Sequence, residues 1–373
     1  MKKILINGIN AKSGGGKSIL INYLKLLQNE KSDLYYFTSP NDEEFQKFQT
    51  SNIKLIKLNS IFKNQFLLIF TYYFLLKILI KLKNIDIVFN QGDLIIPTNI
   101  KQYYLFDWPY AIYPESIVWK KMTFKSKLVR KIKLYFFKKE IHKPNKILCQ
   151  TKTAKKRLQK LYSNKNILVI PNAVSLDNLK KENFSFKFKN IHKKNYNMLY
   201  LTYYYPHKNI DILLDIAEKI KKQNLNIKIY ITISNQQGHG AKKILKHIRN
   251  NSLEKILVNL GPIPMEKVPS LYDQCDALIM PTLLESFSGT YVEAMFHNKT
   301  IYTSDYDFAK DVCGNSAFYF DPLNSDNIFE IIKKNYTNHD KQKELQHNGI
   351  KRLEKMNDWN KTFNEYQKVI KNG

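Results

Sequence analysis

Residues 281–295 read PTLLESFSGTYVEAM, and the interpretation of the whole chain starts from this stretch. An apolar run, Ala277–Met280, precedes it and predicts a buried strand of a parallel sheet. After a short polar loop, a helix is expected to begin near Gly289. The first amides of a helix have no intrahelical partner, and the helix dipole adds partial positive charge there. This corner therefore predicts an anion site, and we expect a diphosphate against Phe287–Thr290.

Two carboxylates flank the expected anion site, Glu285 in the loop and Glu293 inside the helix. Because a carboxylate beside a phosphate repels it, we expect both side chains to contact something else. Sugar hydroxyls suit them, since one carboxylate accepts hydrogen bonds from two neighbouring hydroxyl groups. A diphosphate with a hydroxyl-rich group on either side is the layout of a nucleotide-sugar. The spacing alone is weak evidence, because pairs of glutamates at this distance occur by chance in many chains.

The pattern E-x7-E after a buried strand, continued by Ala294 and Met295, resembles the signature of glycosyltransferase family 4. The resemblance implies a retaining enzyme of the GT-B fold, an α/β architecture of two Rossmann-like doubly wound domains facing across a cleft. It implies a nucleotide-diphosphate sugar as donor, with UDP or GDP expected, and neither a metal nor another cofactor. The implied acceptor is a glycan or a lipid-linked saccharide, in the synthesis of a surface polysaccharide such as capsule, O-antigen or lipopolysaccharide.

The same resemblance gives roles to residues on other loops. Lys208 matches a lysine that the family places on the diphosphate, whereas the arginine expected with it falls on Thr202, and His207 is a partial substitute. The loop at Gly261 and Ile263 is expected to pack on the nucleobase. Glu293 is expected to hold the ribose, and Glu285 the hydroxyls of the transferred sugar. The residues expected around the diphosphate are Phe287, Ser288, Gly289 and Thr290.

The N-terminal segment has a glycine-rich corner of its own. Ile4–Gly8 predicts a strand, and a helix with an apolar face follows the run Gly14–Ser18. This run resembles a P-loop, but the motif requires a glycine where Ala11 stands. We expect Gly15 and Gly16 instead to let the backbone approach a ligand at the helix N-terminus, with a plain tight turn as the alternative. The family resemblance implies that this ligand is the donor phosphates and the acceptor.

The strand predicted at Gln102–Phe106 ends differently from its family counterpart. A histidine directed at the reaction centre usually ends this strand, and here Phe106 and Asp107 take its place. We expect Asp107 to contact the acceptor hydroxyl, with a helix cap or a turn residue as the alternative. The candidate catalytic residues are therefore Glu285, Lys208 and Asp107.

A chain of 373 residues is expected to fold as two domains. We expect an acceptor-side domain over residues 1–175, completed by a helix at 357–373 that crosses back to it. A donor-binding domain is expected over residues 195–356. The basic and polar segment 180–194 predicts the linker.

The net charge of +28 comes from an excess of lysine, since only four of the 60 basic residues are arginine. Nucleic-acid readers favour arginine, so no nucleic-acid partner is expected. Codon bias and attraction to an anionic membrane leaflet both explain such an excess. Phe66–Leu82 is too short to span a bilayer and predicts a core helix, with a surface-lying helix as the alternative. The lysine-rich stretch Lys120–Lys143 predicts a solvated or lipid-facing helix.

Three scattered cysteines and no recognisable signal peptide indicate a cytoplasmic setting, with peripheral contact to the cytoplasmic membrane face left open. Asp305-Tyr306-Asp307 fits the D-x-D metal motif of GT-A transferases, but we expect a loop there and no metal site. Two other classes of function stay open at this point. One is a GT-B nucleotide-sugar epimerase, and the other is a non-enzymatic basic protein that binds membranes or polyanions.

Overall fold

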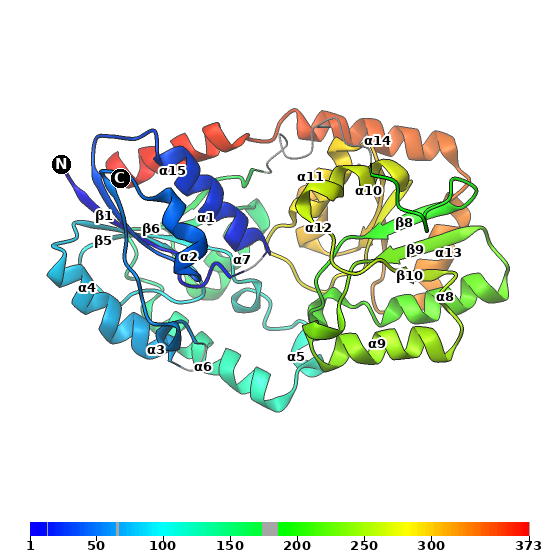
Figure 1. Ribbon diagram of the computed structural model, residues 1–373, viewed down its shortest axis with the longest axis horizontal. Helices are drawn as coiled ribbons and strands as arrows, with labels where there is room; N and C mark the ends of the chain where they lie inside the picture. The colour runs from blue at the N-terminus through cyan, green and yellow to red at the C-terminus, as the bar shows by residue number, and fades with distance from the viewer. Residues whose placement is uncertain (13, 65–66, 174–185, 373) are drawn as a thin grey trace. The chain divides into compact units, whose positions relative to one another are not determined.

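The structure, a computed structural model, describes residues 1–12, 14–64, 67–173 and 186–372. It divides into two compact units (Figure 1). Unit 1 comprises residues 1–114, 122–173 and 357–373, and unit 2 comprises residues 115–121 and 174–356. The predicted domain boundaries place 115–121 in the first domain, whereas the structure places it in unit 2. Part of the predicted linker, residues 180–185, lies outside the described residues.

Unit 1 is built on a parallel sheet with the strand order β3-β2-β1-β4-β5-β6-β7. The chain starts in the middle of this sheet, winds out to β3 and then crosses to β4, the other neighbour of β1. The apolar runs of the strands are buried, as expected for a parallel sheet. The strands are Lys3–Asn7 (β1), Leu34–Thr38 (β2), Ile53–Leu55 (β3), Ile87–Gln91 (β4), Lys101–Phe106 (β5), Lys146–Cys149 (β6) and Ile167–Val169 (β7).

Helix α1 (Gly14–Leu27) follows β1 and packs on one face of the sheet. Its buried residues are the ones that the helical period predicts: Ile19, Leu20, Tyr23, Leu24 and Leu27. Helix α15 (Trp359–Asn372) belongs to the same core, where Phe363 and Tyr366 contact Tyr23 with ring centroids 5.2 and 6.2 Å apart. The other helical elements of unit 1 are Asp42–Phe45 (α2), Gln46–Phe48 (η1), Ser60–Lys63 (η2), Leu68–Phe70 (α3), Thr71–Leu75 (η3), Leu76–Leu82 (α4), Pro109–Ala111 (η4), Phe124–Glu140 (α6) and Lys152–Tyr162 (α7).

Within the segment predicted as a core helix at 66–82, residues 68–82 are helical but only half buried. It consists of α3, the π-helical turn η3 and α4. Leu68, Tyr72, Leu76 and Ile80 are buried in the core on the other face of the sheet. The side chains between them, Phe70, Phe74, Ile78 and Leu82, are exposed. Among the described residues, no helix combines the length and the apolar character needed to cross a bilayer.

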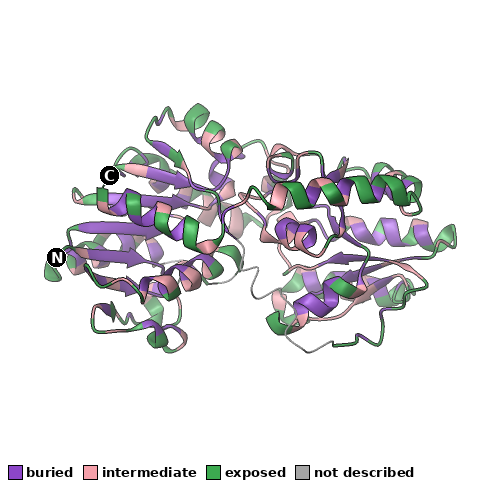
Figure 2. Ribbon diagram, turned by 90° about the horizontal axis from the view of Figure 1, so that it is seen from above, coloured by how far each residue is buried: buried purple, intermediate pink, exposed green. Residues whose placement is uncertain are grey.

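Unit 2 repeats the doubly wound arrangement with a parallel sheet of order β10-β9-β8-β11-β12-β13. The strands are Tyr196–Tyr200 (β8), Ile227–Ile231 (β9), Leu257–Asn259 (β10), Ala277–Met280 (β11), Thr300–Ser304 (β12) and Ala317–Phe320 (β13). The central strands of both sheets are buried, whereas the helices have one buried and one exposed face (Figure 2).

Helical elements cover both faces of the second sheet. They are Val118–Lys121 (α5), Pro206–Lys208 (η6), Ile212–Lys222 (α8), Asn235–Gln237 (η7), His239–Asn250 (α9), Met265–Lys267 (η8), Val268–Gln274 (α10), Gly289–Phe296 (α11), Asp307–Cys313 (α12), Ser325–Asn335 (α13) and His339–Leu353 (α14). Helix α5 contacts η6, and Lys121 donates a hydrogen bond to Asn209. These contacts explain why the segment 115–121 belongs to unit 2.

Candidate active site

In unit 2, β8 and β11 lie side by side at the point where the strand order reverses. Ala277 is opposite Met198 and Leu278 is opposite Leu199. From this pair the chain continues toward β9 on one side and toward β12 on the other. The carboxyl ends of such strands form the crevice in which doubly wound sheets bind ligands. The loops 201–211 and 281–288 begin here, and they carry five residues predicted to bind the donor: Thr202, Lys208, Glu285, Phe287 and Ser288.

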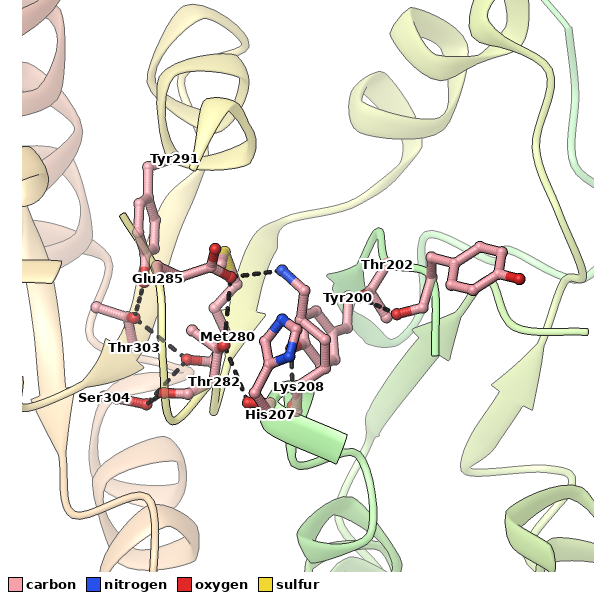
Figure 3. A network of polar contacts seen from close by, with 11 residues as sticks. Tyr200, Thr202, His207, Lys208, Met280, Thr282, Glu285, Tyr291, Thr303 and Ser304 are labelled. Carbon is pink, nitrogen blue, oxygen red and sulfur yellow. Dashed lines mark hydrogen bonds and ion pairs between the residues drawn. The ribbon is translucent and has the colours of Figure 1, made fainter. Parts of the chain in front are cut away.

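The structure pairs two of the predicted catalytic residues with each other. Lys208 Nζ lies 2.5 Å from Glu285 Oε1 (Figure 3). The lysine comes from η6 after β8 and the glutamate from the loop after β11, so the ion pair joins the two loops. Their side chains are only 17% and 12% exposed. Such shielding from water strengthens the attraction between the charges and holds the ammonium group at the crevice.

Backbone carbonyls and hydroxyl groups fix the position of this ion pair. Thr282 Oγ1 donates to the carbonyl oxygen of His207 at 3.2 Å and lies 3.3 Å from Glu285 Oε1. The amide of Leu283 donates to the same carbonyl at 2.8 Å. Tyr200, in β8, donates through its hydroxyl to the carbonyl of Lys208 at 2.8 Å. The loops after β8 and β11 therefore support each other directly.

The neighbouring strand β12 holds the start of the 281–288 loop from its other side. Ser304 Oγ donates to the carbonyl of Thr282 at 2.7 Å, and Thr303 Oγ1 donates to that of Met280 at 3.2 Å. Tyr291, in α11, shares a 2.6 Å hydrogen bond with Thr303. Figure 3 shows this chain of contacts from Tyr291 to Lys208. Turn and helix are thus tied to the sheet by buried hydrogen bonds, which is how a rigid binding corner is built.

Asn209 closes the turn that carries Lys208. Its backbone adopts the left-handed conformation, with φ of 53°, which asparagine tolerates better than most residues. Its side-chain amide donates to the carbonyl of Pro322 at 2.8 Å, and its oxygen accepts from Lys121 Nζ at 2.6 Å. Both bonds tie the turn to segments of unit 2 outside the two loops of the crevice.

Helix α11 begins at Gly289, after Ser288 in the N-cap position, as the sequence predicts. The side chain of Ser288 makes no capping hydrogen bond, so the cap leaves the first amides to other acceptors. Glu293 lies half-buried in this helix, and Glu293 Oε2 accepts a hydrogen bond from the Tyr272 hydroxyl at 3.1 Å. Burial raises the pKa of Glu293, and the hydrogen bond from Tyr272 opposes that rise. The carboxylate is thus held in one orientation.

The remaining predicted donor residues also lie on loops of unit 2. Thr202 follows β8, and its amide and carbonyl both bond to the Thr232 hydroxyl at 2.9 Å. Gly261 follows β10 with φ of 73°, a conformation that favours glycine. Asn259 Oδ1 accepts from its amide at 3.3 Å. Ile263 lies half-buried on the same loop, and Phe287 half-buried on the loop before α11.

Unit 1 brings together two residues that the sequence predicts on the acceptor side. Asp107 directly follows β5, and a Cβ added to Gly16 would lie 3.2 Å from Asp107 Oδ2. A Cβ on Gly15 would meet nothing within 4 Å. Burial raises the pKa of Asp107 to about 7, with a further contribution from the negative charge of Asp93. A carboxyl group with this pKa exchanges protons near neutral pH.

Two other motifs found in the sequence are engaged in ion pairs. Lys17, which a P-loop would direct at phosphate, lies 2.7 Å from Glu44. Asp305, of the D-x-D match, pairs with Lys310, and Asp307 begins helix α12.

Sequence reasoning missed the residues that support the ion pair. These are Tyr200, Asn209, Thr282, Thr303 and Ser304. Tyr200, Thr282, Thr303 and Ser304 share one signal, a polar residue at or just after the carboxyl end of a buried strand, where side chains of neighbouring strands meet. Asn209 lies further along, in the turn after η6. Which partners they select depends on contacts between segments far apart in the chain.

Comparison with known proteins shows that the chain is similar to glycosyltransferases. A family model described as "Glycosyl transferases group 1" matches residues 180–352. The chain is 28% identical over 238 residues to MJ1178 of Methanocaldococcus jannaschii, an uncharacterized glycosyltransferase, which covers 63% of this chain and 62% of that protein. It thus matches less than two thirds of the length of this archaeal relative. It is 24% identical over 300 residues to the O-antigen chain mannosyltransferase RfbU of Salmonella typhimurium, which covers 80% and 73% of the two chains.

Solved structures share the fold over nearly the whole chain. The crystal structure of Anabaena HepE in complex with UDP and glucose has a TM-score of 0.73 at 15% identity and covers 99% of both chains. Other structures with this fold include GT-B glycosyltransferases. The fold is therefore the GT-B fold predicted from the sequence. Residues 180–352 thus match a glycosyltransferase group 1 family model, and the curated relatives of the chain are named as glycosyltransferases.

Proposed function

We propose that the chain is a retaining transferase that moves a sugar from a nucleotide-diphosphate sugar to a glycan or a lipid-linked saccharide. The observation that carries the proposal is the shielded Lys208–Glu285 ion pair, where the loops after β8 and β11 meet. A cation paired with the loop that leads into α11 suits a diphosphate bound at the start of this helix, because backbone amides and the ammonium group would act on the same charge.

Lys208 and the amides at Ser288, Gly289 and Thr290 offset the charge that builds on the departing diphosphate. Such preorganised stabilisation is usually the largest contribution to catalysis. Glu285 holds Lys208 in place and accepts hydrogen bonds from hydroxyls of the transferred sugar. Glu293, oriented by Tyr272, accepts from the ribose hydroxyls. The loop at Gly261 and Ile263 packs on the base, and Thr202 lines the same crevice without the charge of the arginine it replaces.

Asp107 is proposed to contact the acceptor hydroxyl, with Gly15 and Gly16 giving the acceptor access to the backbone of α1. The resemblance to glycosyltransferase family 4 supports retention, with the leaving phosphate accepting the proton of the acceptor. It also supports a reaction that uses the two substrates and no cofactor. UDP is the first donor nucleotide to test, because HepE was crystallised with UDP and glucose. The similarity to RfbU supports a role in surface polysaccharide synthesis.

Calorimetry with UDP-, GDP-, ADP- and CDP-sugars tests the proposal directly. We expect one nucleotide class to bind saturably. Glu293→Ala should weaken that binding by about 1.5–3 kcal/mol, the worth of a hydrogen bond to a charged group. Glu365→Ala, on a helix of unit 1, is the control. Unchanged donor affinity in Glu293→Ala would remove this residue from the site.

Product analysis by NMR then tests the reaction itself. Transfer with retained anomeric configuration is the expected result. Conversion of the donor to an isomer in the absence of any acceptor would replace the proposal with an epimerase.

A further inference from the structure

Unit 1 exposes large apolar side chains in two rows on neighbouring helices. The first row lies on α3, η3 and α4, and the second on α6. We call them the two apolar stripes. The first stripe is Phe70, Phe74, Ile78 and Leu82, and the second is Phe124, Leu128, Ile132 and Tyr135. Exposure reaches 71% at Leu82 and 82% at Phe124. Apolar side chains exposed singly are ordinary, but rows of them mark an interaction surface.

The first stripe is ordered although it faces solvent. The rings of Phe62, Phe70 and Phe74 stack in sequence, with centroids 6.3 and 5.2 Å apart. The π-helical turn η3 lies within this row. In an α-helix of about 3.6 residues per turn, positions spaced by four drift around the axis. A π turn holds more residues per turn and offsets that drift. Phe70, Phe74 and Ile78 thus stay on one side while Tyr72 and Leu76 stay in the core.

The two stripes belong to one region of unit 1. Tyr73 in η3 contacts Phe136 in α6 with ring centroids 5.0 Å apart, and the Tyr73 hydroxyl donates to Glu140 Oε1 at 2.9 Å. The helices α3, α4 and α6 lie along the same edge of unit 1 (Figure 1). On α6 the stripe faces away from the buried residues Lys133, Phe137 and Glu140.

The charge around the stripes has a single sign. Residues 67–83 contain three lysines, and residues 122–139 contain seven lysines and arginines, without an aspartate or glutamate in either segment. Those with exposed side chains are Lys77, Lys81, Lys83, Lys125, Lys131, Lys138 and Lys139. A second copy of this chain would bring like charges together, which opposes association. An anionic lipid surface supplies the opposite charge and an apolar interior.

We propose that the two apolar stripes dock unit 1 onto an anionic bilayer, with Phe, Leu, Ile and Tyr side chains inserted at the level of the headgroups. The lysines around them contact the lipid phosphates. The surface lies outside the donor corner of unit 2, so docking does not depend on nucleotide binding. It deepens the proposed function in one respect, because a lipid-linked saccharide would be presented at the surface where unit 1 docks.

Sedimentation with lipid vesicles tests the docking. The full chain is mixed with vesicles of phosphatidylcholine alone or of phosphatidylcholine with phosphatidylglycerol. We expect binding to the anionic vesicles that weakens as salt rises. The variant Phe74→Ser/Ile78→Ser/Leu128→Ser/Ile132→Ser should bind at least about tenfold more weakly, because its stripes no longer favour insertion. The control Met265→Ser/Ile350→Ser changes exposed apolar residues of unit 2 and should bind like the wild type.

Charge is tested separately with Lys125→Gln/Lys131→Gln/Lys138→Gln against Lys343→Gln/Lys351→Gln/Lys355→Gln. Only the first set should reduce binding to the anionic vesicles. Thermal unfolding and donor affinity should stay unchanged in the stripe variant, since its substituted side chains are exposed. If that variant unfolds early, Phe124→Trp with brominated lipids replaces it, and quenching of the new tryptophan is the expected result.

Equal vesicle binding by the stripe variant and the wild type would overturn the proposal, as would no binding by the wild type. If the wild type formed a dimer and bound no vesicles, and the stripe variant were monomeric, the stripes would instead bind a second copy of the chain. If the wild type bound no nucleotide-sugar, the proposed transferase function would be contradicted. The result of the vesicle experiment would still stand.

Discussion

Lys208 and Glu285 neutralise each other in a shielded corner, so removing one charge leaves the other without compensation. In Lys208→Met we expect turnover to fall about 10²–10³-fold, the effect of losing one group that stabilises transition-state charge. The free energy of unfolding should also fall by about 1–3 kcal/mol, because the Glu285 carboxylate stays largely buried. Steady-state kinetics and chemical denaturation measure the two effects.

The double variant Lys208→Met/Glu285→Gln separates stability from catalysis. It removes both charges, so it should regain most of the lost stability while turnover stays low. Lys341→Met, which breaks an exposed ion pair with Glu344 in the same unit, is the control and should change neither quantity much. Recovery of turnover in the double variant would show that the ammonium group of Lys208 has no part in the chemistry.

The raised pKa of Asp107 predicts how stability depends on pH. The folded state keeps this proton up to about pH 7, whereas an unfolded aspartate loses it near about 3.9. The folded chain therefore binds more protons between these values, and the free energy of unfolding falls as pH rises through this window. The loss should amount to at most roughly 4 kcal/mol. Asp107→Asn should not show this loss of stability. If the free energy of unfolding depended on pH in the same way in both proteins, the raised pKa could not be assigned to Asp107.

At the scale of single elements, the glycine run at the start of α1 offers a matched pair of substitutions. Gly15→Ala adds a methyl group into open space, and alanine favours a helix over glycine by about 0.5–1 kcal/mol. Gly16→Ala places the same group 3.2 Å from Asp107 Oδ2. We expect the first variant to be at least as stable as the wild type and to change the KM for the acceptor less than the second. The second should raise the KM for the acceptor, because the carboxyl group must shift.

Donor affinity serves as the internal control for this pair, since unit 2 is unchanged in both variants. Kinetics with a saturating donor measure the effect on the acceptor alone. Equal acceptor KM values for the two alanine variants would contradict the proposed contact between Asp107 and the acceptor.

Helices and strands whose apolar residues follow one clear period were predictable from the sequence. Elements with apolar side chains on both a buried and an exposed face were not. The buried face of α1 follows from the spacing of Ile19, Tyr23 and Leu27. Residues 68–82 carry apolar side chains at two sets of positions, and periodicity cannot tell which set faces solvent. The π turn depends on packing against the sheet and α6, which no local pattern contains. Apolar residues continue past β3 to Leu58, but β3 ends at Leu55. The Ile56 amide still donates to the Phe37 carbonyl in β2, whereas the Leu58 amide donates to Asp42 instead.

At the scale of the whole molecule, both doubly wound sheets follow from apolar strands that alternate with helices. Glu285, Lys208 and Glu293 were selected from the sequence as site candidates because each follows a recognisable strand. The ion pair between Lys208 and Glu285 was not, since it joins residues 77 positions apart. The sequence also contains no sign that residues 115–121 would pack against η6, because contacts such as the hydrogen bond from Lys121 to Asn209 join residues far apart in the chain.

Helix α15 contributes side chains to the core of unit 1, and its removal from that core should be costly. Phe363 packs against Tyr23 and is 6% exposed. Phe363→Ala should destabilise unit 1 by about 3–5 kcal/mol, the usual cost of truncating a buried aromatic ring. Lys368→Ala, on the exposed side of the same helix, should be close to neutral. Hydrogen exchange followed by mass spectrometry measures unit 1 separately, and equal protection of β1 and β4 in the two variants would contradict the prediction.

The placement of α15 also has a consequence for how the polypeptide is made. A ribosome completes residues 1–173 long before it reaches residues 357–372, yet Phe363, Tyr366, Val369 and Ile370 are part of the first core. In the nascent chain, the apolar surface beside Tyr23 and Phe89 must therefore stay uncovered while the whole of unit 2 is translated. Unit 2, apart from the short piece at 115–121, is continuous in the chain and needs no such late segment. Cotranslational folding should then run against the order of synthesis, with the half made second becoming protease-resistant first.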